Sequence, residues 1–296
     1  MKLFDTHAHF DSFAAEGTVD AVLARAAAAG VARMCAVGSS EASNALVVRL
    51  AQEHPEPLVA AVGYDRDQVD KPHDIEKLAA LAEAPGVAAV GDIGLDHYYS
   101  AETAPQQRAL FAKMLAFAAE RRKPVIVHSR YADEDTIEML GDFSTAWKKL
   151  FPDPHGLVPW VNQVGSGAVA NAPPRSPTAQ GGGGPIPPPG VLHCFTGDAA
   201  FAEELLALGF MISFSGIVSF NNAGPLREVA KRVPEDRLLI ETDCPYLTPK
   251  PFRGKVNEPA YVARVAEVLA EARGVDAAAL AEATFANALR LFQREG

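Results

Sequence analysis

Short apolar runs alternate with longer amphipathic segments along most of this chain. The runs are rich in Val, Ile and Phe and have the length of buried strands. They predict eight strands, at 2–7, 32–37, 58–63, 87–92, 124–128, 191–194, 210–213 and 238–242. Most gaps between them hold a helical pattern, at 19–29, 43–53, 75–84, 105–121 and 199–208. Strand followed by helix, repeated eight times, predicts an α/β chain folded as a (β/α)8 TIM barrel. Two further helices are predicted outside the barrel, at 259–273 and 277–293.

The alternation breaks once, between the fifth and sixth predicted strands. A helix is predicted at 133–140, and a Gly/Pro-rich insertion follows at about 141–190, with GGGG and PPP in its second half. Such a composition cannot offset its ordering entropy by burial, so we expect a flexible segment. Trp147, Phe151 and Trp160 are candidates to dock its first half on the barrel, and its tip is a candidate cover for the active site, although a plain solvated linker is the simpler interpretation. The chain is therefore predicted to be one domain, 1–296, interrupted by this insertion.

Composition and charge narrow the class of protein. The chain is 48% hydrophobic and 22% charged, which is typical of a globular protein. Its formal net charge is -10, the wrong sign for a protein that coats nucleic acid through a broad basic face. A nucleic-acid substrate remains open only if bound metal supplies local positive charge.

Cysteine usage and hydropathy bear on the compartment. The three cysteines are widely spaced and form no CxxC pair, which argues against a disulfide framework and against a thiolate zinc site. The first residues contain no signal-peptide core, and no stretch of 18 or more apolar residues follows. We therefore expect a cytoplasmic protein that does not span a membrane.

Histidine and aspartate residues stand where the apolar runs end. His7 and His9 are two residues apart on a predicted strand, so both side chains face the same side. A lone HxH is a weak signal that also fits ordinary polar residues at a strand end. The other strand ends carry four more candidates, Asp92, His128, His193 and Asp243. Because barrel enzymes build their sites at the carboxyl ends of the strands, six such residues predict a divalent-metal site.

Seven motifs occur in an order that resembles the TatD family of metal-dependent hydrolases. They are DTHAHFD, VGDIGLDHYY, PVIVHSR, VLHCFTG, ISFSGIVSF, ETDCPYLTP and RGKVNEP. The resemblance covers nearly the whole chain outside about 141–190. It implies an amidohydrolase-type barrel in the cytoplasm with metal-dependent deoxyribonuclease activity, often 3'-to-5' exonuclease action on single-stranded DNA. It also implies the same six residues as the ligand set: His7, His9, Asp92, His128, His193 and Asp243.

The chain departs from the family pattern at two places besides the insertion. Asp92 stands where the family usually has Glu, and its side chain is one methylene shorter, so the ion that it helps to bind is expected to be held more loosely. After the third strand the family often has His-Pro, whereas this chain has Gly63, Tyr64 and Asp65. A substrate-side histidine is therefore missing.

We expect two divalent ions, Mg²⁺ or Mn²⁺ with Zn²⁺ as the alternative, which lower the pKa of a bound water and hold the scissile phosphate. Asp243 is the candidate to orient or deprotonate that water, and Asp92 is the candidate to bridge the ions. The expected substrate is DNA, single-stranded or at 3' ends, and no stable protein partner is implied.

Four residues are candidates for substrate binding, and each has an ordinary structural alternative. Arg130 and Arg253 are predicted phosphate clamps or surface ion pairs. Tyr64 is a predicted stacking surface for a base or a packed tyrosine, and His97 approaches the substrate or is a hydrogen-bonded loop residue.

Two other functions fit the same residues. A barrel with this metal site can hydrolyse an ester or amide, including an aminoacyl-tRNA ester, because activated water attacks carbonyl carbon as well as phosphorus. A non-catalytic barrel with a structural ion is less suited, since a structural site uses about four ligands and leaves no open position.

Overall fold

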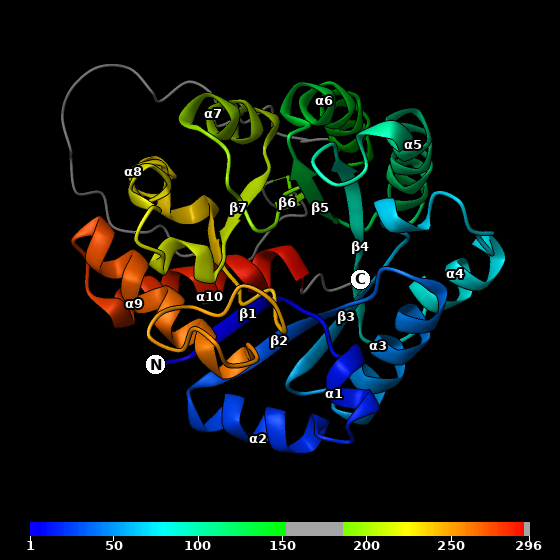
Figure 1. Cartoon of the computed structure of the whole chain (residues 1–296). Coiled ribbons are helices and arrows are strands. Elements are labelled where there is room, and N and C mark those ends of the chain that lie inside the picture. Colours follow the sequence, from blue (N-terminus) through cyan, green and yellow to red (C-terminus); the bar gives the residue numbers. More distant parts are fainter. Residues whose placement is uncertain (152–185, 293–296) are drawn as a thin grey trace, which may run out of the picture.

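Eight parallel strands form the centre of the molecule (Figure 1). The computed structural model describes residues 1–151 and 186–292. Each strand pairs with the next in chain order, and a parallel bridge between Ala8 and Cys244 joins the last strand's end to the first. The strands are β1 (Leu3–Ala8), β2 (Val31–Val37), β3 (Leu58–Val62), β4 (Val87–Asp96), β5 (Val125–Arg130), β6 (Gly190–Leu192), β7 (Met211–Phe214) and β8 (Leu238–Ile240). The predicted (β/α)8 barrel is confirmed.

Helices surround the strands on the outside (Figure 1). They are α1 (Asp11–Ala15), α2 (Val19–Ala28), α3 (Glu41–Glu53), α4 (Ile75–Ala82), α5 (Ala104–Glu120), α6 (Asp133–Leu150), α7 (Ala199–Leu208), α8 (Gly224–Arg232), α9 (Val262–Arg273) and α10 (Ala277–Phe292). Side-chain caps explain several starts: Ser40, Asp74 and Asp198 each accept a hydrogen bond from a backbone N–H of the first turn. Within the part of the chain that the structure describes, no helix is both long and apolar enough to cross a membrane.

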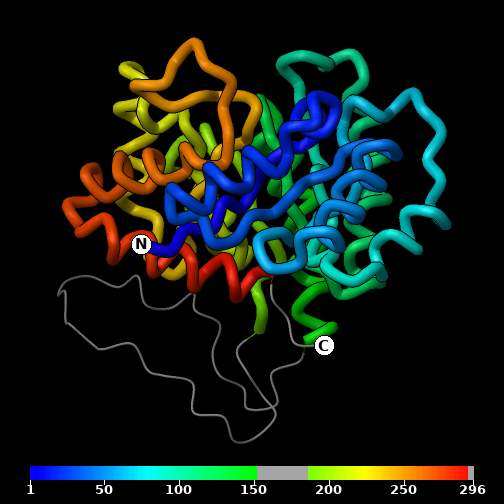
Figure 2. Tube along the Cα trace, turned by 90° about the horizontal axis from the view of Figure 1, so that it is seen from below, coloured from blue at the N-terminus to red at the C-terminus, as the bar shows by residue number. Residues whose placement is uncertain are grey.

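One layer of the core fills the barrel. Its members come from every strand, at alternate positions: Phe4, Cys35, Val37, Val59, Ala61, Ala89, Ile126, Val191, Met211 and Leu239. Leu291 and Phe292 of α10 belong to the same cluster, and the ring of Phe292 stacks on that of Phe4 with centroids 5.6 Å apart. Helix α10 therefore closes the amino end of the barrel. Figure 2 shows it in red, on the side of the molecule opposite the orange loop that follows β8.

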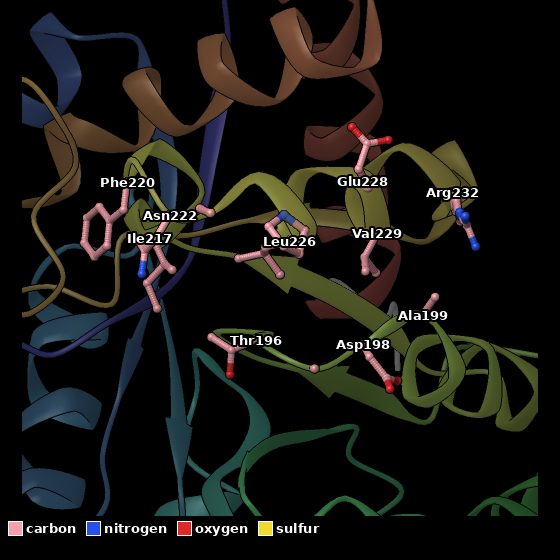
Figure 3. A pocket seen from close by; sticks show the side chains of 13 residues that line it. Thr196, Asp198, Ala199, Ile217, Phe220, Asn222, Leu226, Glu228, Val229 and Arg232 are labelled. Carbon is pink, nitrogen blue, oxygen red and sulfur yellow. The ribbon is translucent and has the colours of Figure 1, made fainter.

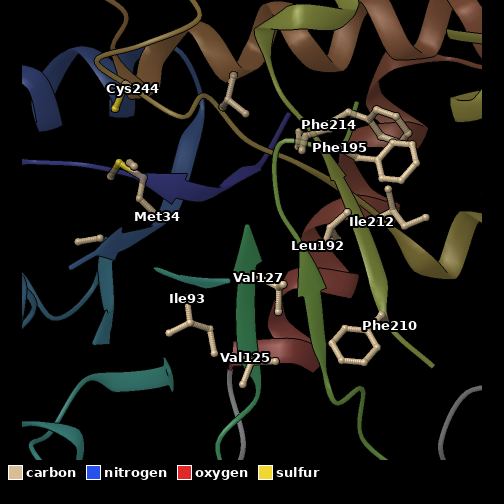
Figure 4. Packing of buried hydrophobic residues seen from close by; sticks show 14 of the residues in the cluster. Met34, Ile93, Val125, Val127, Leu192, Phe195, Phe210, Ile212, Phe214 and Cys244 are labelled. Carbon is tan, nitrogen blue, oxygen red and sulfur yellow. The ribbon is translucent and has the colours of Figure 1, made fainter. Parts of the chain in front are cut away.

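The second layer lies between the strands and the helices. The outward positions of the same strands, such as Val125, Val127, Ile212 and Phe214, are buried there (Figure 4). Because strand side chains alternate between faces, each strand serves both layers and reads as a continuous apolar run. This arrangement leaves the carboxyl ends of the strands as the place where polar side chains meet.

Helix α6 corrects the predicted start of the insertion. The helix continues from Asp133 to Leu150, ten residues beyond the predicted end at Leu140. Trp147 is 1% exposed and packs against Phe143 and Phe151, while its Nε1 donates to the carbonyl of Pro187 at 2.9 Å. The insertion thus begins after this docked helix. Trp160 and the tip proposed to cover the site lie outside the described residues.

Candidate metal centre

The inward face of the strands changes from apolar to polar at the carboxyl end of the barrel. In β5, Ile126 lies in the barrel interior and His128 stands two residues further on. Val191 and His193 repeat this spacing at β6. Since strand side chains have a period of two, these histidines take the next inward position above the apolar layer. The pairing of the strands in the barrel therefore places His128 and His193 on the same side of the sheet, at the carboxyl end of the barrel.

The first ligand group contains His7, His9 and Asp243, whose ligand atoms lie within 4.8 Å of one another. The Nε2 atoms of the two histidines are 3.1 Å apart, and Asp243 Oδ1 is 3.8 and 3.7 Å from them. His9 Nδ1 donates to the carbonyl of Val37 at 3.2 Å, which leaves the lone pair of Nε2 free. Asp243 follows β8, and its backbone N–H donates to His7 O at 2.9 Å.

The second ligand group contains His7, Asp92 and His193, also within 4.8 Å of one another. His193 Nε2 is 3.6 Å from Asp92 Oδ1, and its ring stacks on that of His7 with centroids 3.9 Å apart. One imidazole nitrogen binds only one ion, so His7 cannot serve both groups through the same atom. His128 lies beside the second group, because its Nδ1 is 3.4 Å from His193 Nε2.

Two buried acidic residues that sequence analysis missed lie against His128 and His193. Asp96 Oδ2 accepts a hydrogen bond from His128 Nε2 at 3.3 Å, which leaves Nδ1 to face the second group. Glu241 Oε1 lies 3.5 Å from His193 Nδ1 and accepts from the backbone N–H of Cys194 at 2.5 Å. Asp96 lies in the motif VGDIGLDHYY and Glu241 in the motif ETDCPYLTP. Their positions close in sequence to the candidate ligands Asp92 and Asp243 were the signal that could have identified them. Asp96 also shows that β4 continues past its predicted end at Asp92, because it pairs in register with Arg130 of β5.

The side chains fit a divalent cation. Burial lowers the pKa of His7 and His193 well below its usual range and that of His128 to about 4. The imidazoles are therefore neutral near pH 7, the form that binds metal. Asp92 is 3% exposed, and its Oδ1 has no hydrogen-bond partner among the described residues. A buried carboxylate oxygen without a partner is costly, and a cation would satisfy it.

Arg66 brings a fixed positive charge to this centre. It lies in the 3-10 turn η1 (Arg66–Gln68) after β3, and its side chain is 19% exposed. Its Nη1 is 3.8 Å from Asp92 Oδ2 and 3.3 Å from Asp65 Oδ2, and its Nε is 3.8 Å from Asp96 Oδ2. Burial raises the pKa of Asp92 well above its usual range, and Arg66 opposes that shift. Sequence analysis missed Arg66, because it follows a strand in a loop without a ligand motif.

Comparison with known proteins identifies the family of this chain. The family model described as "TatD related DNase" matches residues 4–293. The chain belongs to the TatD family. The uncharacterized metal-dependent hydrolase YcfH of Escherichia coli K12 is 39% identical over 99% of this chain and 96% of its own length. The 3'-5' ssDNA/RNA exonuclease TatD of Pectobacterium carotovorum is 31% identical over 98% of this chain and 99% of its own. The crystal structure of YJJV, a TatD homologue from E. coli K12, covers 99% of this chain and 98% of its own, with a TM-score of 0.80 and 29% identity.

This TatD protein is accordingly a metal-dependent hydrolase, and the two ligand groups account for where a metal would bind. The structure brings five of the six predicted ligands into the two groups and places the sixth, His128, beside the second. The number and identity of the ions remain predictions.

The predicted substrate residues of the TatD chain lie in different surroundings. Tyr64 is 2% exposed, and its hydroxyl donates to the carbonyl of Asp74 at 3.2 Å. A buried ring has no face for a base, so the alternative of a packed tyrosine describes Tyr64. His97 Nε2 is 3.7 Å from Asp135 Oδ2, in the loop after β4.

The two arginines both lie over aromatic rings. The guanidinium carbon of Arg130 is 4.2 Å from the ring centroid of Tyr98. That of Arg253 is 4.5 Å from the centroid of Phe220, and its Nη1 donates to the carbonyl of Thr248 at 3.3 Å. Among the residues that the structure describes, neither arginine forms an ion pair with a carboxylate, and the phosphate-clamp role of both stays a prediction.

A cavity of about 560 Å³ lies between α7 and α8 (Figure 3). Thr196 and Asp198 line it on one side, and Ile217, Leu226 and Arg232 line it on the other. Its lining includes none of the six candidate ligands. Metal chemistry therefore belongs to the barrel mouth and not to this cavity.

Proposed function

We propose that this TatD protein hydrolyses phosphodiester bonds in nucleic acid, as a 3'-to-5' exonuclease on single-stranded DNA. The observation that carries the proposal is the pair of adjacent ligand groups joined by the stacked rings of His7 and His193. Two cations side by side suit in-line displacement at phosphorus, because they stabilise the attacking and the leaving oxygen together. The Pectobacterium relative, which is named a 3'-5' ssDNA/RNA exonuclease, supports the same proposal.

The chain's own residues divide the work. Divalent ions, for which we expect Mg²⁺ or Mn²⁺, supply positive charge for the phosphate and lower the pKa of water. The side chain of Asp243 is 13% exposed and that of Asp92 is 4% exposed, so water that enters from solvent meets Asp243 first. Asp243 then orients the water and accepts its proton. Asp92 is buried and holds the second group together.

We propose further that the protein acts in the cytoplasm and without a stable protein partner. All three cysteines, Cys35, Cys194 and Cys244, are free thiols. Unpaired cysteines are usual in reducing compartments.

End-labelled single-stranded oligonucleotides test the proposal. Purified protein with Mn²⁺ or Mg²⁺ should shorten a 5'-labelled strand stepwise from its 3' end, and a chelator should stop the reaction. Asp243→Asn should reduce the rate by about 100- to 10,000-fold, the range for loss of a general base. The matched control is Asp142→Asn on the exposed face of α6, which should leave the rate unchanged.

Two results would contradict the proposal. Wild-type rates in Asp243→Asn would remove this aspartate from the mechanism. Absence of cleavage with every metal would favour the ester or amide alternative, which the 39% identical relative, named only as a metal-dependent hydrolase, leaves open. Hydrolysis of aryl or aminoacyl esters by the same preparation would then identify that chemistry.

A further inference from the structure

Three tyrosines form an exposed cluster at the mouth of the barrel. Tyr98, Tyr99 and Tyr131 are 54%, 68% and 75% exposed. The rings of Tyr98 and Tyr131 stack with centroids 5.3 Å apart, and Tyr99 meets Tyr98 edge-on at 4.7 Å. The guanidinium of Arg130 lies over Tyr98 and Tyr99, 4.2 and 4.6 Å from the ring centroids. We call Tyr98, Tyr99, Arg130 and Tyr131 the tyrosine platform.

The platform is held by the ends of two paired strands. Asp96 Oδ1, at the end of β4, accepts from the backbone N–H groups of Tyr98 and Tyr99, both at 2.9 Å. The backbone N–H of His97 donates to the carbonyl of Arg130 at the end of β5, also at 2.9 Å. The rings are thus presented by anchored backbone, and a ligand that uses them need not order a loose loop.

The same anchor connects the platform to the metal centre. The other oxygen of Asp96, Oδ2, accepts from Nε2 of the candidate ligand His128 at 3.3 Å. Arg130 and Tyr131 follow His128 by two and three residues. At about 3.3 Å per strand residue, the backbone of Tyr131 lies within about 10 Å of that of His128. A polymeric substrate with one phosphate at the candidate ligands can therefore place its neighbouring residues beside these rings.

The chemistry of the platform favours flat aromatic ligands. Exposed aromatic rings with a neighbouring guanidinium bind unstacked nucleobases, because every base offers a π face. A net charge of -10 gives this protein no general attraction for phosphates, so stacking is the available source of affinity away from the metal. We propose that the tyrosine platform stacks unpaired bases of a single-stranded nucleic acid whose backbone lies at the metal centre. This inference rests on the proposed function and explains its preference for single strands, since duplex bases have both faces covered.

Equilibrium binding tests the platform without turnover. Fluorescence anisotropy would measure the Kd of the Mn²⁺-loaded protein for a short oligothymidylate with phosphorothioate linkages and for an abasic strand with the same linkages. The wild type should bind the base-bearing strand about 5- to 100-fold more tightly than the abasic strand, as expected for one stacked base. Tyr131→Ala and Tyr99→Ala should lose most of this preference, because the ring that the base contacts is gone.

Three controls separate stacking from other effects. Tyr131→Phe and Tyr99→Phe keep the ring without the hydroxyl and should retain the preference. Val275→Ala removes another exposed apolar side chain, 42% exposed, at the junction of α9 and α10, and should behave as the wild type. A duplex of the same length should bind more weakly than the single strand.

The outcomes distinguish failure of the platform from failure of the proposed function. If both alanine variants keep the wild-type preference for bases, the platform inference is overturned while the nuclease proposal stands. If the wild type binds both strands equally yet cleaves an ordinary oligonucleotide, the inference is overturned in the same way. If the wild type neither binds nor cleaves either strand, the proposed function fails and the inference fails with it.

Discussion

At the scale of single residues, burial and hydrogen bonds determine the protonation of the candidate histidine ligands. Burial keeps the pKa values of His7, His128 and His193 low, so these imidazoles are neutral without a metal. Hydrogen bonds to Val37 O and Asp96 then leave one nitrogen of His9 and one of His128 free for an ion. The selection of the ligand atom is thus made by neighbours that bind no metal themselves.

Arg66 acts in the opposite direction, because it repels a cation beside Asp92. A charge a few ångströms from a partly buried site changes ion affinity substantially. We predict that Arg66→Met, which keeps the aliphatic length and removes the charge, strengthens Mn²⁺ binding at the second group by about tenfold or more. Isothermal titration of the metal-free protein would give both the stoichiometry and the two affinities.

The control for this variant is Arg108→Met. Arg108 pairs with Asp135 and Glu138 on helix α6, away from the ligand groups. Its loss should leave both metal affinities unchanged. Equal or weaker Mn²⁺ binding in Arg66→Met would show that the guanidinium supports the ligand geometry more than it repels the ion.

At the scale of elements, helix α6 shows how tertiary contacts extend a local pattern. Its last turns carry Phe143 and Trp147 at helical spacing, and both side chains are buried. Trp147 also reaches forward in sequence, because it donates to Pro187 just before β6. A hydrogen bond therefore connects helix α6 to the residues just before β6.

Trp147→Ala should lower the free energy of unfolding by about 3–5 kcal/mol, the usual cost of removing a large buried aromatic side chain. Urea denaturation followed by circular dichroism would measure it. Lys148→Ala, at the next and exposed position, should change stability by less than about 0.5 kcal/mol. If the two variants are equally stable, α6 is not docked through Trp147.

For the whole molecule, the candidate metal centre joins segments that are far apart in sequence. The candidate ligands come from β1, β4 and β5 and from residues just after β1, β6 and β8. An ion bound to them stabilises the folded barrel alone, since the unfolded chain cannot gather these side chains.

Metal removal should therefore lower the melting temperature by several degrees. An ion present at about 1,000 times its Kd adds roughly 4 kcal/mol to the free energy of unfolding. Burial raises the pKa of Asp92 and of Asp243 well above its usual range, so protons compete with the ion and the stabilisation should fade as the pH falls. Differential scanning calorimetry with Mn²⁺ or EDTA between pH 8 and pH 5 would measure both effects. An unchanged melting temperature on addition of EDTA at pH 8 would contradict the prediction. The melting temperature of Asp243→Asn should change less on metal removal than that of the wild type.

The barrel and the positions of the ligands could be read from the chain because both follow a short sequence period. Alternation along each strand places His128 two residues above Ile126 and His193 two residues above Val191, whatever the rest of the molecule does. The end of α6 and the start of the insertion could not be read in this way, because the last turns of the helix depend on the burial of Phe143 and Trp147 and on the hydrogen bond from Trp147 to Pro187.

Tertiary structure alone decided which loop residues join the centre. Arg66 and the three tyrosines of the platform lie after strands, where no period constrains the path of the backbone. Tyr64, two residues before Arg66, is buried, whereas Arg66 lies beside Asp92. The partners of Asp96 likewise depend on the pairing of β4 with β5. Local periodicity thus specifies the strand residues that face the barrel mouth, whereas the charges and rings around them depend on contacts between segments that only the closed barrel brings together.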